Sequence, residues 1–208
     1  MIRELLSAVG VVVFPPRCAC ELARPLNARP PQGLCEPCAE AAEFAPESSA
    51  VAPYESGGAV ASTVVAAKFH RREESALALG QMLAQHEPAR ALSAEFDGLV
   101  PIPLSPQRYW ARGFNPAESI AGVCAEQWGV PVHRHLKRVR DTRPQSELAL
   151  EAREKNIRDA FEATGPVQGR FILIDDVMTS GATLRAGAKA LLQAGASEVR
   201  FAVVCVSA

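Results

Sequence analysis

The chain has 208 residues, of which 48% are hydrophobic, and it carries 22 lysines and arginines against 23 aspartates and glutamates. This length suits one sizeable core with a small accessory module beside it. The near-zero net charge gives no support to nucleic-acid or membrane binding driven by bulk charge, so any basic surface must be local. No apolar run approaches the roughly 18 residues of a membrane span, and we expect a cytoplasmic protein without membrane insertion.

Residues 1–50 are rich in proline and arginine and leave little room for a long helix or strand. We expect a small module here that is too poor in core residues to fold without a cross-link or a metal ion. Its four cysteines suggest a metal ion rather than disulfides. The pair Cys35 and Cys38 has the spacing of a zinc knuckle, whereas Cys18 and Cys20 are one residue short of it. The prediction is a structural Zn²⁺ held by these four cysteines in a zinc-ribbon-like module, and the alternative is a degenerate module held by packing alone.

Residues 51–208 alternate between helical and strand-like patterns, which predicts an α/β domain with a mainly parallel sheet flanked by helices. The single cysteines Cys124 and Cys205 lie in apolar surroundings and are expected in the core. In chain order the expected elements are an amphipathic helix over 73–85, a strand from Gly98, a helix over 116–127, the short segment 130–136, a helix around 148–157, a strand over 171–174, a helix from Thr183 and a strand from Val199.

The segment "FILIDDVMTSGATLRAGAKALL", 171–192, joins a strand to a helix through an acidic and hydroxyl-rich loop. The apolar run 171–174 is typical of a strand buried on both faces, so Asp175 and Asp176 are predicted at its carboxyl end, where open α/β sheets bind ligands. The apolar residues of the helix, Leu184, Ala188, Leu191 and Leu192, should fall on one face, with Arg185 and Lys189 on another.

Each residue of this loop also has an ordinary structural interpretation, in which Asp176 or Thr179 caps the helix and Gly181 makes a turn. The whole string favours a binding site instead. Hydroxyls, a glycine and free backbone N–H groups at a helix start accept a phosphate. Two carboxylates beside a phosphate would repel it unless they bind ribose hydroxyls, with or without a bridging Mg²⁺.

The string "ILIDDVMTSGAT" resembles the phosphoribosyl pyrophosphate motif of type I phosphoribosyltransferases. The resemblance implies the type I phosphoribosyltransferase fold. It also implies that Asp175 and Asp176 contact the ribose and that the loop after them contacts the 5-phosphate. The phosphate-binding residues would be Thr179, Ser180, Gly181, Ala182 and Thr183. The segments 100–121 and 138–161, together with the N-terminal cysteines, narrow the resemblance to the ComF family.

In that family the loop after "VPIPLS" faces pyrophosphate, which makes Arg108, Arg112 and Gly113 candidate contacts. The alternative is an ordinary solvated loop anchored by Phe114. The basic segment 133–143 stands where the superfamily carries a mobile loop, and Arg143 and Gln145 are further pyrophosphate candidates.

The resemblance implies two functions. The first is binding of phosphoribosyl pyrophosphate with Mg²⁺, with a transferase activity whose acceptor and catalytic base the sequence does not name. The second is a non-catalytic competence factor that binds single-stranded DNA and a helicase or recombination partner. For that role the basic segment would contact phosphates, and Tyr109 and Trp110 would stack on bases or, in the case of Trp110, simply pack.

Overall fold

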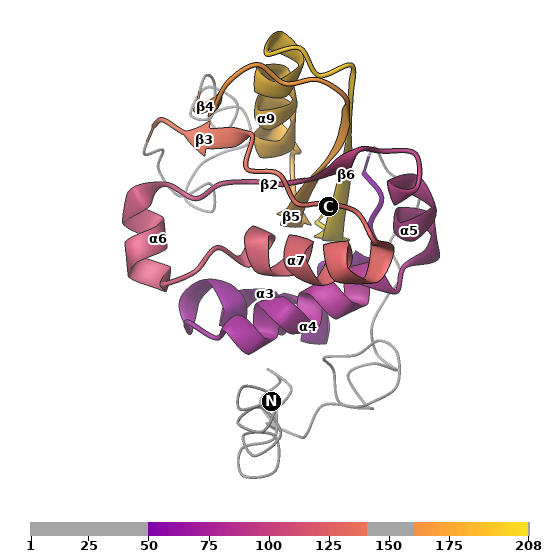
Figure 1. Cartoon of the computed structure of the whole chain (residues 1–208). Helices are drawn as coiled ribbons and strands as arrows, with labels where there is room; N and C mark the ends of the chain where they lie inside the picture. Colours follow the sequence, from indigo (N-terminus) through magenta and orange to yellow (C-terminus); the bar gives the residue numbers. More distant parts are fainter. Residues whose placement is uncertain (1–49, 141–159, 208) are drawn as a thin grey trace, which may run out of the picture.

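The computed structural model describes residues 50–140 and 160–207 (Figure 1). The cysteine module and the helix predicted around 148–157 lie outside these residues. Along the described chain the elements are β1 (Tyr54–Glu55), α3 (Gly58–Phe69), α4 (Glu73–Ala84), α5 (Glu87–Ser93), β2 (Gly98–Pro101), α6 (Pro106–Arg112), α7 (Pro116–Trp128), β3 (Leu136–Arg138), β4 (Phe161–Ala163), β5 (Arg170–Met178), α9 (Ala182–Gln193) and β6 (Glu198–Val206).

The main sheet is parallel throughout and has the strand order β1-β6-β5-β2. A separate antiparallel pair, β3 with β4, lies outside it. Parallel neighbours need crossover connections, and the helices between the strands supply them. The predicted α/β architecture is therefore confirmed for the described part of the chain.

Two hydrophobic cores lie on opposite faces of the sheet. Along β5, Ile172 and Ile174 pack toward α3, α4 and α7, whereas Phe171 and Leu173 pack toward α9 and the β3-β4 pair. Figure 1 shows α9 on one side of the sheet and α3, α4 and α7 on the other. This alternation follows from the two-residue period of a strand, and both faces of β5 are apolar because helices or strands cover both.

Several sequence predictions are confirmed. The helix expected over 73–85 is α4, the helix expected over 116–127 is α7, and the strands expected from Gly98 and Val199 are β2 and β6. Cys124 and Cys205 are buried and free, as expected for core residues. The helices α3, α5 and α6 were not predicted. No helix within 50–140 or 160–207 has the length and apolar character needed to cross a membrane.

The predictions for the central strand and helix were wrong in three respects, of which two concern their bounds and one the face of the helix. The strand does not stop at Ile174 but continues through the acidic pair to Met178, because β6 continues to pair with it up to Met178 opposite Val206. The helix begins at Ala182 rather than Thr183. Leu192 is 47% exposed, so it lies outside the buried face that Leu184 and Leu191 share.

Helices α4 and α7 pack closely because α4 carries a glycine at their contact. A Cβ at Gly80 would lie 2.8 Å from Val123 Cβ and 3.2 Å from Ile120 Cα. Cys124 Sγ, also on α7, lies 3.8 Å from the Gly80 carbonyl oxygen. By contrast, a Cβ at Gly122, on the exposed side of α7, would meet nothing within 4 Å.

Replacing these two glycines with alanine should change stability in opposite directions. Gly80→Ala should lower the free energy of unfolding by roughly 1 kcal/mol, because overpacking outweighs the gain in helix propensity. Gly122→Ala should raise it by about 0.5–1 kcal/mol through helix propensity alone. Urea unfolding followed by circular dichroism measures both, and a stabilising Gly80→Ala would contradict the packing described here.

Candidate functional site

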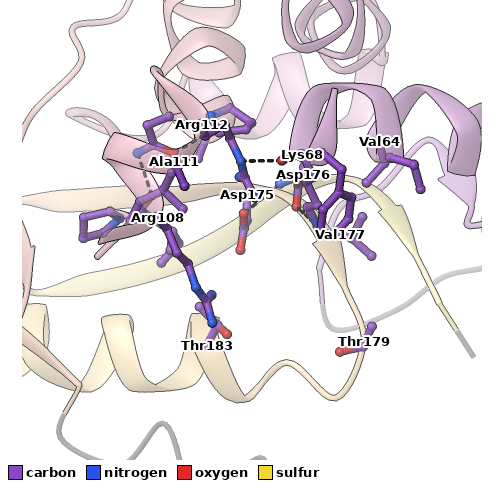
Figure 2. Close-up of a pocket in the computed structure, with 18 of the residues that line it drawn as sticks. Val64, Lys68, Arg108, Ala111, Arg112, Asp175, Asp176, Val177, Thr179 and Thr183 are labelled. Carbon is purple, nitrogen blue, oxygen red and sulfur yellow. Dashed lines mark hydrogen bonds and ion pairs between the residues drawn. The ribbon is translucent and has the colours of Figure 1, made fainter. Parts of the chain in front are cut away.

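A cavity of about 870 Å³ opens where β2 and β5 end (Figure 2). The segment after β2 and the last residues of β5 contribute to it, and α3 and α6 form walls beside them. Open α/β sheets bind their ligands in this position. The charged side chains that line the cavity are Lys68, Arg71, Arg108, Arg112, Arg138, Asp175 and Asp176.

The opening arises because the strands on either side of β5 have different lengths. β2 pairs with β5 only as far as Pro101 opposite Ile174, while β6 accompanies β5 to Met178. Asp175 and Asp176 therefore remain in the sheet on one side and border the cavity on the other. Their place at this edge agrees with the sequence prediction, although they lie inside the strand rather than after it.

The two adjacent aspartates point to different sides of β5, as strand geometry requires. Asp176 is 4% exposed, and its Oδ1 lies 2.9 Å from Lys68 Nζ, which α3 supplies. Asp175 is half-buried, and in Figure 2 its carboxylate points toward the side where Arg108 and Thr183 lie. Asp176 is thus engaged by a cation of the protein, and Asp175 is the carboxylate that faces the cavity.

The charges of this group shift one another's pKa values. Burial, and then the negative charge of Asp176, raise the pKa of Asp175 to about 7, although Lys68 partly opposes this. Burial by itself lowers the pKa of Lys68, but the attraction of Asp176 and Asp175 outweighs it and leaves that pKa raised. Lys68 therefore stays protonated, whereas Asp175 exchanges its proton near neutral pH.

Two arginines tie α3 and α6 together behind the Lys68–Asp176 pair. Arg112 Nε donates to the Lys68 carbonyl oxygen at 2.8 Å, and Arg71 Nε donates to the Arg112 carbonyl oxygen at 3.4 Å. Arg71 has φ = 54°, a backbone conformation that costs energy for a residue with a side chain. The predicted pyrophosphate contact Arg112 thus has a positioning role in this structure, because it holds the end of the helix that carries Lys68.

Arg108 reaches over the cavity from the first turn of α6. Ser105 caps that helix by accepting from Arg108 N at 3.4 Å. Asn115 holds the preceding segment, since its Nδ2 donates to the Ile102 carbonyl oxygen at 3.0 Å. Figure 2 shows the Arg108 side chain pointing toward Thr183, so this predicted pyrophosphate candidate meets the predicted phosphate loop across the cavity.

The loop between β5 and α9 is short. Gly181 is the N-cap of α9 with φ = 71°, and a Cβ there would lie 2.9 Å from an Arg185 guanidinium nitrogen. Thr179 and Thr183 line the cavity. The residues between them, Ser180, Gly181 and Ala182, form the turn and do not line the cavity. The Ser180 carbonyl oxygen accepts from Arg185 at 2.7 Å.

The other candidates fall into two groups. Gly113 is the left-handed C-cap of α6, with φ = 89°, and it borders a smaller hollow beside the main cavity. Arg143, Gln145 and the four ligand candidates of the cysteine module lie outside the described residues.

The basic segment from His133 to Arg140 is largely occupied by contacts within the fold. His133 and His135 stack on each other and on the edge of Phe171. Lys137 pairs with Glu162 at 3.1 Å. Arg138 lies over the Phe161 ring at 5.5 Å and also lines the cavity. The segment thus contributes one cation to the cavity, and its histidines serve packing.

Sequence reasoning missed Lys68, Arg71 and the exposed Phe69, all of which line the cavity. The signal for Lys68 was present, because it is the single charged residue of the small and apolar helix GAVASTVVAAKF. A lone charge in such a helix indicates a buried partner. Finding that partner required the fold, since Asp176 is more than a hundred residues away in the chain.

Comparison with known proteins shows which proteins the chain is similar to. Residues 124–208 match the phosphoribosyl transferase domain. The chain is 35% identical over 143 residues to the DNA utilization protein YhgH of Salmonella typhi, covering 66% of this chain and 63% of that protein. It is 30% identical over 109 residues to Competence protein F of Haemophilus influenzae, covering 50% of this chain and 48% of that protein.

A solved structure of glutamine phosphoribosylpyrophosphate amidotransferase from B. subtilis, complexed with ADP and GMP, aligns with a TM-score of 0.41 and 25% identity, covering 62% of this chain and 25% of that one. The chain spans less than two thirds of the length of the relatives named above. The resemblance inferred from the sequence is confirmed by the domain match and by these relatives. The chain belongs to the ComF/YhgH family of proteins with a phosphoribosyl transferase domain.

Proposed function

We propose that the cavity binds phosphoribosyl pyrophosphate, or a related ribose phosphate, together with Mg²⁺. The observation that carries this proposal is that Asp175, Arg108 and Thr183 converge on one cavity from three separate segments. Asp175 would accept from the ribose hydroxyls, and Thr179 in the loop before α9 and Thr183 in its first turn would hold the 5-phosphate. Arg108 would contact the pyrophosphate.

The charge of the cavity supports a polyanionic ligand. Five cationic side chains and two carboxylates line it, and one of those carboxylates, Asp176, is neutralised by Lys68. A cleft with this excess of positive charge attracts phosphate groups and stabilises them once bound. The sequence predicted that both aspartates contact the ribose. Because Lys68 neutralises Asp176, we propose this role for Asp175 alone.

The donor set fits Mg²⁺. This ion prefers oxygen ligands and is commonly held by one or two carboxylates plus oxygens of a bound phosphate. Asp175 offers such a carboxylate, while the ion pair with Lys68 competes for Asp176. When bound, Mg²⁺ would neutralise charge on the pyrophosphate.

We further propose that the protein transfers the ribose phosphate group to an acceptor. In such a reaction the bond from the anomeric carbon to the pyrophosphate oxygen breaks, and a bond to the acceptor's nucleophile forms. This chain would contribute position and charge, with Arg108 stabilising the leaving pyrophosphate and Asp175 orienting the ribose.

We also propose that the four N-terminal cysteines hold a structural Zn²⁺. The support is the spacing of Cys18, Cys20, Cys35 and Cys38 in a proline-rich segment. Four protein ligands would leave no open coordination position, so this ion would stabilise the module without taking part in chemistry.

A second candidate function is binding of single-stranded DNA, in concert with a helicase or recombination partner. The observation that favours it is the exposure of Tyr109 and Trp110 on α6, beside Arg108; Trp110 is 82% exposed. A tryptophan that could have been a packing residue is thus available for base stacking. The names of two relatives, which refer to DNA utilization and to competence, also support a role in DNA binding.

Asp175→Asn should weaken binding of phosphoribosyl pyrophosphate with Mg²⁺ by about 10-fold to 100-fold, because a charge-assisted contact is lost. Isothermal titration calorimetry measures the affinity. Asparagine preserves the shape and the Oδ1 that accepts from Asp176 N at 2.9 Å. Glu198→Gln, which removes a carboxylate at the opposite end of the sheet, should have no effect. Equal affinities for wild type and Asp175→Asn would overturn the site assignment.

The affinity should also depend on pH. Because the pKa of Asp175 is raised to about 7, its carboxylate forms as pH rises through neutrality, and binding should strengthen between about pH 6 and pH 8. The ligand's phosphates titrate near pH 6 in the same direction, so the diagnostic quantity is the difference between wild type and Asp175→Asn. The two pH profiles should diverge above pH 7; parallel profiles would contradict a role for Asp175 ionisation.

For the second function, Trp110→Ala should weaken binding of a short single-stranded oligonucleotide by about 1–3 kcal/mol, the contribution of one stacked base. Gel shifts across a salt series give the affinity and the number of phosphate contacts. The matched control is Leu192→Ala, which removes an exposed apolar side chain from a different helix, α9. An unchanged affinity in Trp110→Ala would remove α6 from any DNA-binding surface.

A further inference from the structure

Helix α6 differs from the other helices of the described ranges 50–140 and 160–207, because none of its side chains is buried. Its half-buried side chains are Arg108 and Arg112, and both line the cavity. The outer face carries Tyr109 and Trp110, which are 47% and 82% exposed. A surface helix ordinarily turns apolar residues inward and polar residues outward, so the pattern of α6 is inverted.

The ends of α6 are held by polar contacts, two of which are long. Arg112 Nε donates to the Lys68 carbonyl oxygen at 2.8 Å. The hydrogen bond from Arg71 Nε to the Arg112 carbonyl oxygen and the cap from Ser105 are both 3.4 Å long. Elements with little apolar burial open locally at a low free energy. We therefore expect α6 to open more readily than α7, which has a buried face.

The backbone after α6 can absorb a movement of the helix. Gly113 follows the helix with φ = 89°. The nearest atom to a Cβ built on Gly113 would be an Arg71 guanidinium nitrogen, 3.7 Å away. This end of the helix is thus not tightly packed, and a glycine tolerates changes of φ and ψ that other residues resist.

The inward face of α6 brings two positive charges to one cavity. Burial lowers the pKa of Arg112, Asp176 partly opposes this, and the positive charge of Arg108 adds to it. Like charges four residues apart on a helix repel each other. A pyrophosphate group between the two arginines would remove this repulsion and accept hydrogen bonds from both. The inward position of α6 therefore gains free energy when such a group occupies the cavity.

We infer that α6 is a ligand-responsive wall, which opens readily while the cavity is empty and is held in place by a pyrophosphate group bound to Arg108 and Arg112. This inference rests on the proposed function, which assigns the pyrophosphate to this side of the cavity. Tyr109 and Trp110 lie on the outer face of the same helix, so occupancy of the cavity also fixes the position of their rings. The cavity and this aromatic surface are then coupled sites, at which a ligand of one changes the affinity of the other.

Hydrogen–deuterium exchange of the full chain, followed by mass spectrometry, tests the response of α6 with two ligands. Phosphoribosyl pyrophosphate and ribose 5-phosphate share the sugar and the 5-phosphate and differ in the pyrophosphate. Each is added with Mg²⁺ at a concentration that calorimetry shows to be saturating. Phosphoribosyl pyrophosphate should slow exchange of the α6 amides about threefold to tenfold, whereas ribose 5-phosphate should leave it unchanged. The amides of α7 are the internal reference.

A matched pair of variants tests whether the arginines of α6 carry the effect. In Arg108→Gln, saturating phosphoribosyl pyrophosphate should slow α6 exchange far less than in wild type, because the helix loses a contact with the pyrophosphate. Arg90→Gln removes an exposed arginine from α5 and should respond like wild type. Figure 1 shows α5 and α6 at opposite sides of the molecule.

Tryptophan fluorescence reports on the outer face independently of exchange. The chain has two tryptophans, so Trp128→Phe leaves Trp110 as the single fluorescent indole. Phosphoribosyl pyrophosphate should raise the fluorescence anisotropy of Trp110 in this variant, and ribose 5-phosphate should not. Because Trp128 Nε1 donates to the Ala84 carbonyl oxygen at 2.9 Å, circular dichroism is used to verify that the variant folds.

The outcomes separate this inference from the proposed function. Binding of phosphoribosyl pyrophosphate without slower α6 exchange would overturn the coupling alone. Equal slowing by the two ligands, or equal slowing in Arg108→Gln and wild type, would overturn it as well. The same holds if α6 without ligand exchanges as slowly as α7. Binding of neither ligand would overturn the proposed function and the coupling with it.

Discussion

The site depends on one ion pair, between the partly buried Lys68 on α3 and the buried Asp176 on β5. A carboxylate with 4% exposure would be costly without a partner, and removing one member of such a pair leaves the other uncompensated. Arg112 holds the end of α3 through the Lys68 carbonyl, and Arg71 in turn holds the end of α6. One series of contacts thus fixes the strand and the two helices that surround the cavity.

This pair gives two neighbouring aspartates different properties. Strand alternation sends Asp176 to the side of α3, where it is neutralised, and sends Asp175 to the cavity, where burial and the adjacent negative charge raise its pKa to about 7. The two aspartates look equivalent in the sequence but differ in the structure. Asp176 forms an ion pair with Lys68, whereas Asp175 titrates near neutral pH. The difference originates in the two-residue period of the strand and in the position of α3.

Local patterns were enough to predict α4, α7, β2, β6 and the succession of β5 and α9, since hydrophobic period and turn residues determine these elements. The end of β5 could not be predicted, because it depends on how far β6 continues to pair beside it. The partner of Lys68 could not be predicted either, because ion pairs between distant segments leave no local pattern. Helix α3 was missed since its small and apolar residues show no clear amphipathic period.

That weak period has a physical cause. One side of α3 packs on the core through Val60 and Ala67, and another side lines the cavity with Val65 and Phe69, so apolar residues surround much of the helix. A helix that served packing alone would place polar residues on its second face. Arg71, whose left-handed backbone conformation costs energy, lies just beyond the exposed Phe69, and both residues border the cavity. Backbone strain beside a cavity is the pattern expected where a site is selected for binding rather than for stability.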